Sequence, residues 1–226
     1  MQQTSHWHRL ETADQVASAA CQHILKAAGQ AIAEHGKFKL VLAGGSTPEK
    51  VYGLLAQADA DWANWVIYYG DERCLPADDA DRNSMIACRT LLDKVAIPAN
   101  QIFTIAAELG NEQAATAYRP IVASALPFDM VMLGVGEDGH TASLFPGHVH
   151  NEDELVHAVY DSPKAPPMRV SISAKALSDT RGLMFLITGS NKREIVKAWH
   201  AGQALPVTTI TPEHPVDIYI DSAAEA

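Results

Sequence analysis

The sequence predicts an α/β fold built on a mostly parallel sheet. Short apolar runs rich in β-branched and aromatic residues alternate along the chain with segments whose apolar residues recur at helical spacing. This alternation is typical of parallel sheets covered by helices. The chain has 226 residues, of which 47% are hydrophobic and 19% charged. This length and composition suit one globular domain over residues 1–226 with a sizeable core.

The first 125 residues predict four helices and three strands. Residues 13–35 carry apolar side chains three or four positions apart, as an amphipathic helix does. Ser46-Thr47-Pro48-Glu49 has the composition of a helix start, because it offers capping hydroxyls, a proline in the first turn and a capping-box glutamate. In chain order the expected elements are helix 13–35, strand 39–43, helix 46–58, strand 65–69, helix 85–95, strand 101–105 and helix 111–125.

The remaining residues continue the alternation. Strands are expected over the apolar runs 128–133, 169–173, 182–187 and 216–220, the last of which closes the sheet. Ser190 is the expected cap of a helix that stops at Gly202. Residues 146–168 hold histidines, acidic residues and four prolines, a composition that predicts a long surface excursion rather than a domain boundary.

Composition also limits the kinds of partner. The net charge of −10 at neutral pH argues against nucleic acid or an anionic membrane as the main partner, because both require a basic surface. The N-terminal residues lack the layout of a signal peptide, and no apolar run approaches the ~18–20 residues that span a bilayer. Three cysteines without a Cys-x-x-Cys pair predict no disulfide framework, with Cys21 and Cys88 in the core. We therefore expect a soluble protein of the cytoplasm.

Four polar segments each follow a predicted strand directly. They are Gly44-Gly45-Ser46-Thr47, Asp71-Glu72-Arg73, Gly136-Glu137-Asp138-Gly139-His140 and Gly189-Ser190-Asn191-Lys192. In an open parallel sheet, ligands bind beyond the carboxyl ends of the strands. We therefore expect these four segments to converge on one edge of the sheet and to form a binding site.

The segment Gly44-Gly45-Ser46-Thr47, at a helix start, predicts an anion site. Glycine allows backbone N–H groups to face an anion, and the helix N-terminus contributes partial positive charge. Lys192 on the same edge favours phosphate as that anion. The segment lacks the lysine of a Walker A loop and the spacing of a dinucleotide fingerprint. The segment Asp71-Glu72-Arg73 has two interpretations, a solvated turn or a functional group that contacts sugar hydroxyls or takes part in catalysis.

His140 is the candidate general base. Its ordinary pKa near neutrality allows it to accept and return a proton, and Asp138, two residues earlier, can orient the imidazole. Three glycines within residues 134–139 give the loop conformations that side chains forbid. Metal binding is disfavoured, because the short His-x-His pairs at 6–8 and 148–150 lack supporting ligands. A serine nucleophile is disfavoured as well, because the chain has no Gly-x-Ser-x-Gly elbow.

These segments carry a resemblance to the 6-phosphogluconolactonase family. The matching residues are Leu42–Pro48, Tyr69–Arg73 with Arg82 and Asn83, Gly134–Pro146, and Pro166–Ser171. The resemblance runs through residues 42–193 in family order, and the long third segment is the specific one. It implies a doubly wound, mostly parallel sheet with helices on both faces, as in glucosamine-6-phosphate deaminase.

The same resemblance implies hydrolysis of 6-phosphoglucono-1,5-lactone to 6-phosphogluconate in the oxidative pentose phosphate route, without a redox or metal cofactor. By this similarity His140 is the base that activates water, and Asp138 orients it. The residues expected to bind substrate are Gly44, Gly45, Ser46 and Thr47 along the pocket, Arg169 and Lys192 at the phosphate, and Asp71 and Arg73 at the sugar. A functional link to glucose-6-phosphate dehydrogenase, whose product would be the substrate, is left open.

Two alternatives share parts of this pattern. A glucosamine-6-phosphate deaminase or related isomerase would share residues 44–48 and the turn at 138–140, but that family continues with Phe-Asn-Glu-Pro, whose glutamate works with the histidine. Here the stretch is Ser143-Leu144-Phe145-Pro146, which has no carboxylate. The other alternative is a non-catalytic sugar-phosphate sensor domain. Such sensors carry a DNA-binding segment ahead of the domain, whereas few residues precede the helix expected at 13–35 and the charge is acidic.

Overall fold

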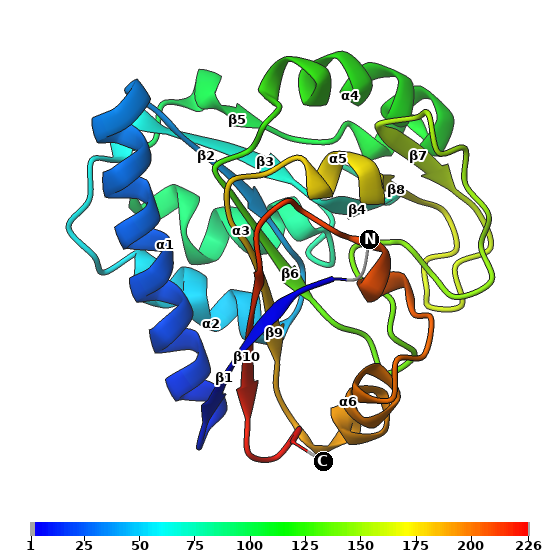
Figure 1. The fold of residues 1–226 in the computed structure, drawn as a ribbon. Coiled ribbons are helices and arrows are strands. Elements are labelled where there is room, and N and C mark those ends of the chain that lie inside the picture. Colours follow the sequence, from blue (N-terminus) through cyan, green and yellow to red (C-terminus); the bar gives the residue numbers. More distant parts are fainter. Residues whose placement is uncertain (1–2, 226) are drawn as a thin grey trace.

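The computed structural model describes residues 3–225, which form two sheets (Figure 1). Every pairing in the seven-stranded sheet is parallel, which confirms the parallel sheet expected from the alternating pattern. In sheet order its strands are β1 (Ser5–Leu10), β10 (Val216–Asp221), β9 (Leu183–Ile187), β6 (Met130–Gly134), β2 (Phe38–Leu42), β3 (Trp65–Tyr69) and β5 (Ile102–Phe103). The smaller, antiparallel sheet has the order β4 (Asp71–Arg73), β8 (Arg169–Ile172) and β7 (Val156–Val159).

Helices lie on both sides of the larger sheet (Figure 1). They are α1 (Ala13–His35), α2 (Ser46–Leu55), α3 (Asn83–Thr90), α4 (Asn111–Ala125), α5 (Ala174–Ser178) and α6 (Arg193–His200). α1 and α2 pack against each other and against the sheet, whereas α6 lies on the other side, where Trp199 meets Phe185 of β9 edge to face. The expected doubly wound α/β fold is therefore confirmed.

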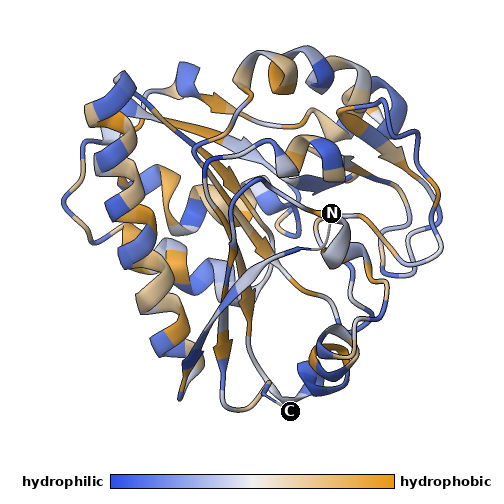
Figure 2. Cartoon of the chain, in the orientation of Figure 1, coloured by the Kyte–Doolittle hydropathy of each residue, from blue (hydrophilic) through white to orange (hydrophobic). Residues whose placement is uncertain are grey.

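The central strands form the hydrophobic core, and they are the most apolar part of the chain (Figure 2). Every residue of β9 is buried, as are the first four residues of β6. Strands that are covered on both faces are continuous apolar runs rather than alternating ones, which is why both are evident in the sequence. The end of each buried apolar run therefore sets the point at which the strand ends.

The ends of α1 follow from its caps. The Thr12 hydroxyl accepts a hydrogen bond from the Gln15 N–H at 3.2 Å, which satisfies a free donor of the first turn. Gly36 ends the helix in the left-handed conformation, with φ 82°, and its N–H reaches the Ile32 carbonyl. Glycine commonly ends helices in this way. The helix expected over 13–35 is confirmed with these bounds.

Two expected helix caps are wrong. α2 begins at Ser46, but its N-cap is Gly45, with φ 115°, and no side chain caps the helix. Ser190 lies inside a 3-10 turn (Ser190–Lys192) whose N-cap is Gly189, and α6 begins only after this turn. In both places a glycine with positive φ makes the turn and is the N-cap, so the neighbouring serine hydroxyl does not cap the helix.

Two edge strands, β1 and β7, were not expected from the sequence, whereas β5 at the other edge of the larger sheet lies within the strand expected over 101–105. β1 lies outside β10 and pairs with it in parallel, so the strand at 216–220 does not close the sheet. β1 is a partly exposed edge strand, and its polar residues weaken the apolar signal. The excursion expected over 146–168 contains β7, which pairs with β8. The strand expected over 169–173 is therefore confirmed, but it belongs to the smaller sheet.

Asp71-Glu72-Arg73 is a strand rather than a solvated turn. Glu72 is fully buried, and its carboxylate accepts hydrogen bonds from the N–H groups of Asn83 and Ser84, both at 2.8 Å. These donors belong to the first turn of α3, so the carboxylate caps that helix and complements its dipole. The Arg82 guanidinium lies 3.5 Å from the same carboxylate. This buried cluster fixes β4 against α3 at the edge of the sheet.

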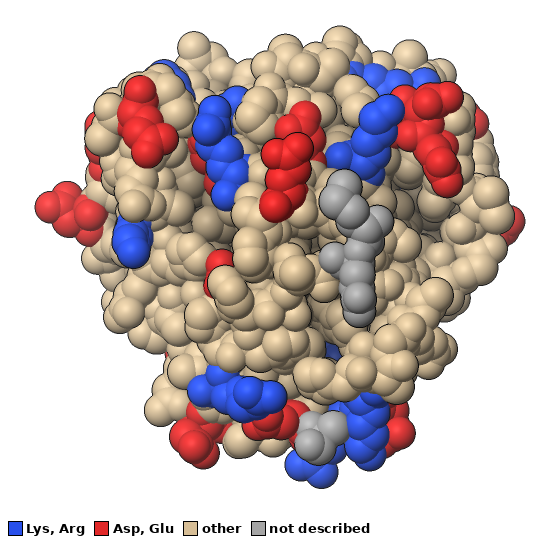
Figure 3. All heavy atoms as spheres, in the orientation of Figure 1, with Lys and Arg blue, Asp and Glu red and all other residues tan. Residues whose placement is uncertain are grey.

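Charged groups of both signs are interspersed over the face of the molecule shown in Figure 3. Cys21, Cys74 and Cys88 are free thiols. Cys21 is buried as expected, and Cys88 packs against the core while remaining partly exposed. Among residues 3–225, no helix combines the length and the apolar character needed to cross a membrane.

Glu72→Gln is expected to lower the free energy of unfolding by about 3 kcal/mol or more, because the buried guanidinium of Arg82 then loses the buried one of its two carboxylate partners. Urea denaturation measures this loss. Glu108→Gln is the matched control. Glu108 lies at the surface and its carboxylate is 2.8 Å from the same guanidinium, so the loss of this ion pair should lower the free energy of unfolding by less than ~1 kcal/mol. Equal losses in the two variants would contradict the role of Glu72 as the buried anchor.

Candidate active site

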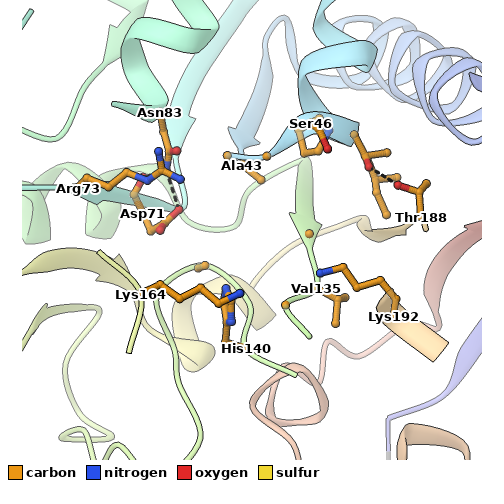
Figure 4. A pocket seen from close by; sticks show the side chains of 18 of the residues that line it. Ala43, Ser46, Asp71, Arg73, Asn83, Val135, His140, Lys164, Thr188 and Lys192 are labelled. Carbon is orange, nitrogen blue, oxygen red and sulfur yellow. Dashed lines mark hydrogen bonds between the residues drawn. The ribbon is translucent and has the colours of Figure 1, made fainter. Parts of the chain in front are cut away.

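A pocket of about 430 Å³ lies at the carboxyl ends of β9, β6, β2 and β3. These four strands are parallel neighbours in the sheet, so the segments that follow them meet at one edge, as the sequence predicted. Of the residues predicted to form the site, those that line the pocket are Gly44, Gly45, Ser46, Thr47, Asp71, Arg73, His140, Arg169 and Lys192. Figure 4 labels Ser46, Asp71, Arg73, His140 and Lys192 among them. Asp138 completes the predicted set through its hydrogen bond to His140.

His140 and Asp138 form a pair within one turn. Nδ1 of His140 lies 2.5 Å from an Asp138 carboxylate oxygen, which also accepts a hydrogen bond from the His140 backbone N–H at 3.2 Å. Because a carboxylate only accepts, Nδ1 carries the hydrogen and Nε2 keeps its lone pair. The imidazole lines the pocket (Figure 4), so the pair can present a proton acceptor to a bound molecule.

Burial keeps this imidazole neutral. Burial lowers the pKa of His140 below its ordinary value, and the hydrogen bond with Asp138 opposes that effect only in part. For Asp138, burial raises the pKa, but the interactions with His140 outweigh burial and leave the pKa lowered. At neutral pH the pair is therefore a neutral imidazole beside a carboxylate, which is the state that a general base requires.

The turn that holds this pair requires glycine at two positions. Gly139 has φ 81°, a conformation that is open mainly to glycine. The Gly136 N–H donates to the His140 carbonyl at 2.8 Å and closes the turn. A Cβ atom on Gly136 would lie 2.0 Å from Nδ1 of His140 and 2.6 Å from the Asp138 carboxylate. The pair can therefore form only when residue 136 has no side chain.

The N-terminus of α2 forms another part of the pocket. The N–H groups of its first turn have no partner within the helix, and the helix dipole adds partial positive charge there. The Thr47 hydroxyl is hydrogen-bonded to the Thr188 hydroxyl at 2.6 Å, which links the first turn of α2 to the loop after β9. Lys192 extends into the pocket from the loop after β9 (Figure 4), and burial lowers its pKa. An anion bound here would compensate that partly desolvated ammonium.

Asp71 and Asn83 are held in place by buried hydrogen bonds. Nδ2 of Asn83 donates to one Asp71 carboxylate oxygen at 3.0 Å, and the Ser143 hydroxyl donates to the other at 2.7 Å. Within residues 3–225, Oδ1 of Asn83 is buried without a hydrogen-bond partner. Since Asn83 lines the pocket, this oxygen can accept a hydrogen bond from a ligand hydroxyl. Arg73 lies beside Asp71 (Figure 4), and its Nη1 donates to the Asp81 carbonyl.

Arg169 is held by the protein more firmly than the predicted phosphate role requires. Its guanidinium donates to three backbone carbonyls, those of Lys164, Ala165 and Pro166, at 2.9 to 3.2 Å. The guanidinium also packs over the Phe145 ring, with 5.7 Å between its central carbon and the ring centroid. These three hydrogen bonds are donated by Nε and Nη2 of Arg169, and Nη1 takes no part in them. Arg169 therefore lines the pocket as predicted, but most of its donors are already engaged.

Three further polar residues that line the pocket were not predicted as site residues: Asn83, Lys164 and Thr188. A fourth, Asn191, lies in the segment 189–192 that was expected at this edge, but it was given no role of its own. Thr188 and Asn191 follow β9, so their position after a strand was an available signal. Asn83 belongs to the family resemblance, but its position also suited a plain helix start. Lys164 lies in the proline-rich excursion and follows no strand, so local sequence gave no signal for it.

Gly136→Ala is expected to break the Asp138–His140 pair, because the new methyl group would overlap the imidazole. NMR of the ring nitrogens should show the Nδ1-protonated tautomer in the original protein and its loss in the variant. Gly29→Ala in α1 is the control: its new Cβ has no atom within 4 Å, and alanine favours a helix over glycine by about 1 kcal/mol. An unchanged tautomer in Gly136→Ala would be incompatible with this turn geometry.

Known proteins are similar to this chain in sequence and in fold. The model of the family described as glucosamine-6-phosphate isomerases/6-phosphogluconolactonase matches residues 11–219. A 6-phosphogluconolactonase of Mycobacterium tuberculosis is 37% identical over 211 residues, which cover 86% of this chain and 85% of that protein. The crystal structure of a 6-phosphogluconolactonase from Thermotoga maritima has a TM-score of 0.89 at 27% identity, and the match covers 96% of this chain and 100% of that chain.

A monomeric glucosamine-6-phosphate deaminase has a TM-score of 0.84 at 20% identity, with 96% of this chain and 98% of that chain covered. At that identity the likeness concerns the fold alone. The family model and the mycobacterial relative both extend over most of the chain. The chain therefore belongs to the glucosamine-6-phosphate isomerase/6-phosphogluconolactonase family, and its named relatives place it among the 6-phosphogluconolactonases.

Proposed function

We propose that this chain hydrolyses 6-phospho-D-glucono-1,5-lactone to 6-phospho-D-gluconate, the lactonase step of the oxidative pentose phosphate pathway. The observation that carries the proposal is that the His140–Asp138 pair and the N-terminus of α2 share one pocket. A pocket that combines a base with anion-binding groups suits a phosphorylated ester, because binding one end positions the other. The relatives that are named 6-phosphogluconolactonases support the choice of substrate.

His140 acts as the general base in this reaction. Its Nε2 takes a proton from a water molecule while the water oxygen attacks carbon 1 of the lactone, and Asp138 stabilises the imidazolium that results. The electron pair of the carbonyl bond moves onto the carbonyl oxygen as the tetrahedral intermediate forms. When the intermediate collapses, the carbonyl re-forms, the bond to the ring oxygen breaks, and that oxygen receives the proton back from His140. This chemistry needs no redox or metal cofactor.

The phosphate binds at the N-terminus of α2 in this proposal. The first N–H groups of the helix, at Ser46 and Thr47, and the ammonium of Lys192 supply donors and positive charge. Asp71 and Arg73 contact the hydroxyl groups of the sugar. Binding energy from the phosphate, which does not react, can then be used to orient carbon 1 beside the base.

The two alternatives explain fewer of these observations. An isomerase needs a further carboxylate after the histidine, and residues 141–146 contain none. Asp71 does not replace that carboxylate as an acid or base, because its two oxygens already accept hydrogen bonds from Asn83 and Ser143. A sugar-phosphate sensor would bind a similar ligand but would have no use for a neutral imidazole held by a carboxylate. We therefore prefer the lactonase.

The proposal includes the cytoplasmic location expected from the sequence, and the three free thiols support a reducing compartment. The expectation that neither nucleic acid nor a membrane is the main partner stays a prediction from the net charge. A functional link to glucose-6-phosphate dehydrogenase also stays a prediction, and it would place the supply of lactone next to its hydrolysis.

His140→Gln is expected to lower kcat by about 10²- to 10⁴-fold, the usual contribution of a general base. The assay follows 6-phosphogluconate formation from freshly generated lactone, with spontaneous hydrolysis subtracted. The affinity for 6-phosphogluconate should change little, because the phosphate end of the pocket is intact. Wild-type turnover in this variant would exclude His140 as the base.

The pH profile of kcat/KM is expected to show the titration of His140. The neutral imidazole is the active form, so activity is present above the pKa of His140 and is lost as the pH falls through it. Since burial lowers this pKa from its ordinary value of 6.5, the acidic limb should lie below about pH 6.5. A limb centred above pH 7 would disagree with the burial of the imidazole.

A further inference from the structure

Lys164 enters the pocket from the segment that the sequence predicted as a surface excursion. Its side chain extends toward His140 (Figure 4), and both residues line the same cavity. The ion pairs that lysines form within residues 3–225 involve Lys50 and Lys197. The ammonium of Lys164 is therefore available to a ligand.

The backbone around Lys164 is fixed from two sides. The Ser162 hydroxyl donates to the Lys164 carbonyl at 2.8 Å and accepts from the Lys164 N–H at 3.2 Å. Nη2 of Arg169 donates to the carbonyls of Lys164 and Ala165 at 3.1 and 2.9 Å, and Nε donates to that of Pro166 at 3.2 Å. Arg169 is only 5% exposed, so water competes little with these hydrogen bonds. The arginine thus acts as a clamp on the lysine's backbone.

The charges around His140 come from three parts of the chain. Burial has the largest effect on the pKa of His140; Asp138 on the same turn raises it, Lys164 lowers it, and Asp71 of β4 raises it. Burial has the largest effect on the pKa of Lys192 and lowers it; Glu137 raises this pKa, and Lys164 lowers it. Two ammonium groups that repel each other thus share one pocket. Negative charge on a bound molecule would relieve that repulsion.

We propose that Lys164 is a catalytic residue of the lactonase reaction, whose ammonium binds the lactone carbonyl oxygen as negative charge forms there, and that Arg169 is the positioning residue that holds Lys164. This inference rests on the proposed function. The phosphate is assigned to Lys192 and α2, which leaves Lys164 beside the base. A positive charge beside the carbonyl oxygen stabilises the tetrahedral intermediate more than the uncharged ground state. Lys164 transfers no proton and keeps its charge throughout.

The test compares Lys164→Met, which removes the charge, with Lys164→Arg, which keeps it. Lys164 is exposed, so neither change disturbs the core. We expect Lys164→Met to lower kcat by about 10²-fold, the usual loss when an oxyanion donor is removed, with a small change in KM. Lys164→Arg should retain most of the turnover. Without the neighbouring positive charge, the pKa of the His140 ring should rise, which NMR titration and the acidic limb of kcat/KM both measure.

Two further variants separate the roles of the cations. Lys192→Met should mainly raise KM and weaken inhibition by inorganic phosphate. Arg169→Lys keeps the positive charge but cannot hold three carbonyls, so it should reproduce the loss in kcat and the shifted His140 titration of Lys164→Met. If Arg169 instead bound phosphate, Arg169→Lys would raise KM and leave the titration of His140 unchanged, and the positioning role would be overturned.

Failure of this inference can be distinguished from failure of the proposed function. Full turnover and an unchanged His140 titration in Lys164→Met, in a wild type that hydrolyses the lactone, would overturn the role of Lys164 and leave the lactonase standing. A wild-type protein that does not accelerate lactone hydrolysis would overturn the lactonase proposal, and the catalytic role of Lys164 with it.

Discussion

The shared direction of four buried strands is the constraint on which the rest of the structure depends. β9, β6, β2 and β3 are parallel neighbours, so the segments after them all emerge at one edge of the sheet. Each of two central strands, β9 and β6, is a continuous buried apolar run, so the end of the run sets the point at which the polar segment after it begins. The positions of His140, Lys192 and the first turn of α2 therefore follow from the core.

Positively charged side chains gather at that edge of the sheet, although the chain as a whole is acidic. The chain has a net charge of −10, yet four cationic side chains line one pocket: Arg73, Lys164, Arg169 and Lys192. Positive groups gathered in a concave site focus the local potential whatever the net charge of the protein. Not all four are equivalent, because Arg169 is committed to backbone carbonyls whereas the lysines extend freely into the cavity. An acidic protein can thus present a local site for an anion.

Much of the fold and of the candidate site could be predicted from the sequence, because buried strands and their loops leave local patterns. The loop at 134–140 shows its glycines, its carboxylate and its histidine together. β1 and β7 could not be predicted, since they are edge strands in which polar residues such as His6, His8 and His157 separate the apolar ones. Lys164 could not be predicted either, because its place depends on hydrogen bonds to Arg169 that form only when the smaller sheet assembles.

The central claim is that one pocket holds the phosphate at α2 and carbon 1 of the sugar at His140. A crystal structure of the His140→Gln protein with bound 6-phosphogluconate tests it most directly. We predict that the phosphate contacts Lys192 and the N–H groups of Ser46 and Thr47, and that the product carboxylate lies beside residue 140. A phosphate beside residue 140, or a ligand bound outside this pocket, would contradict the claim.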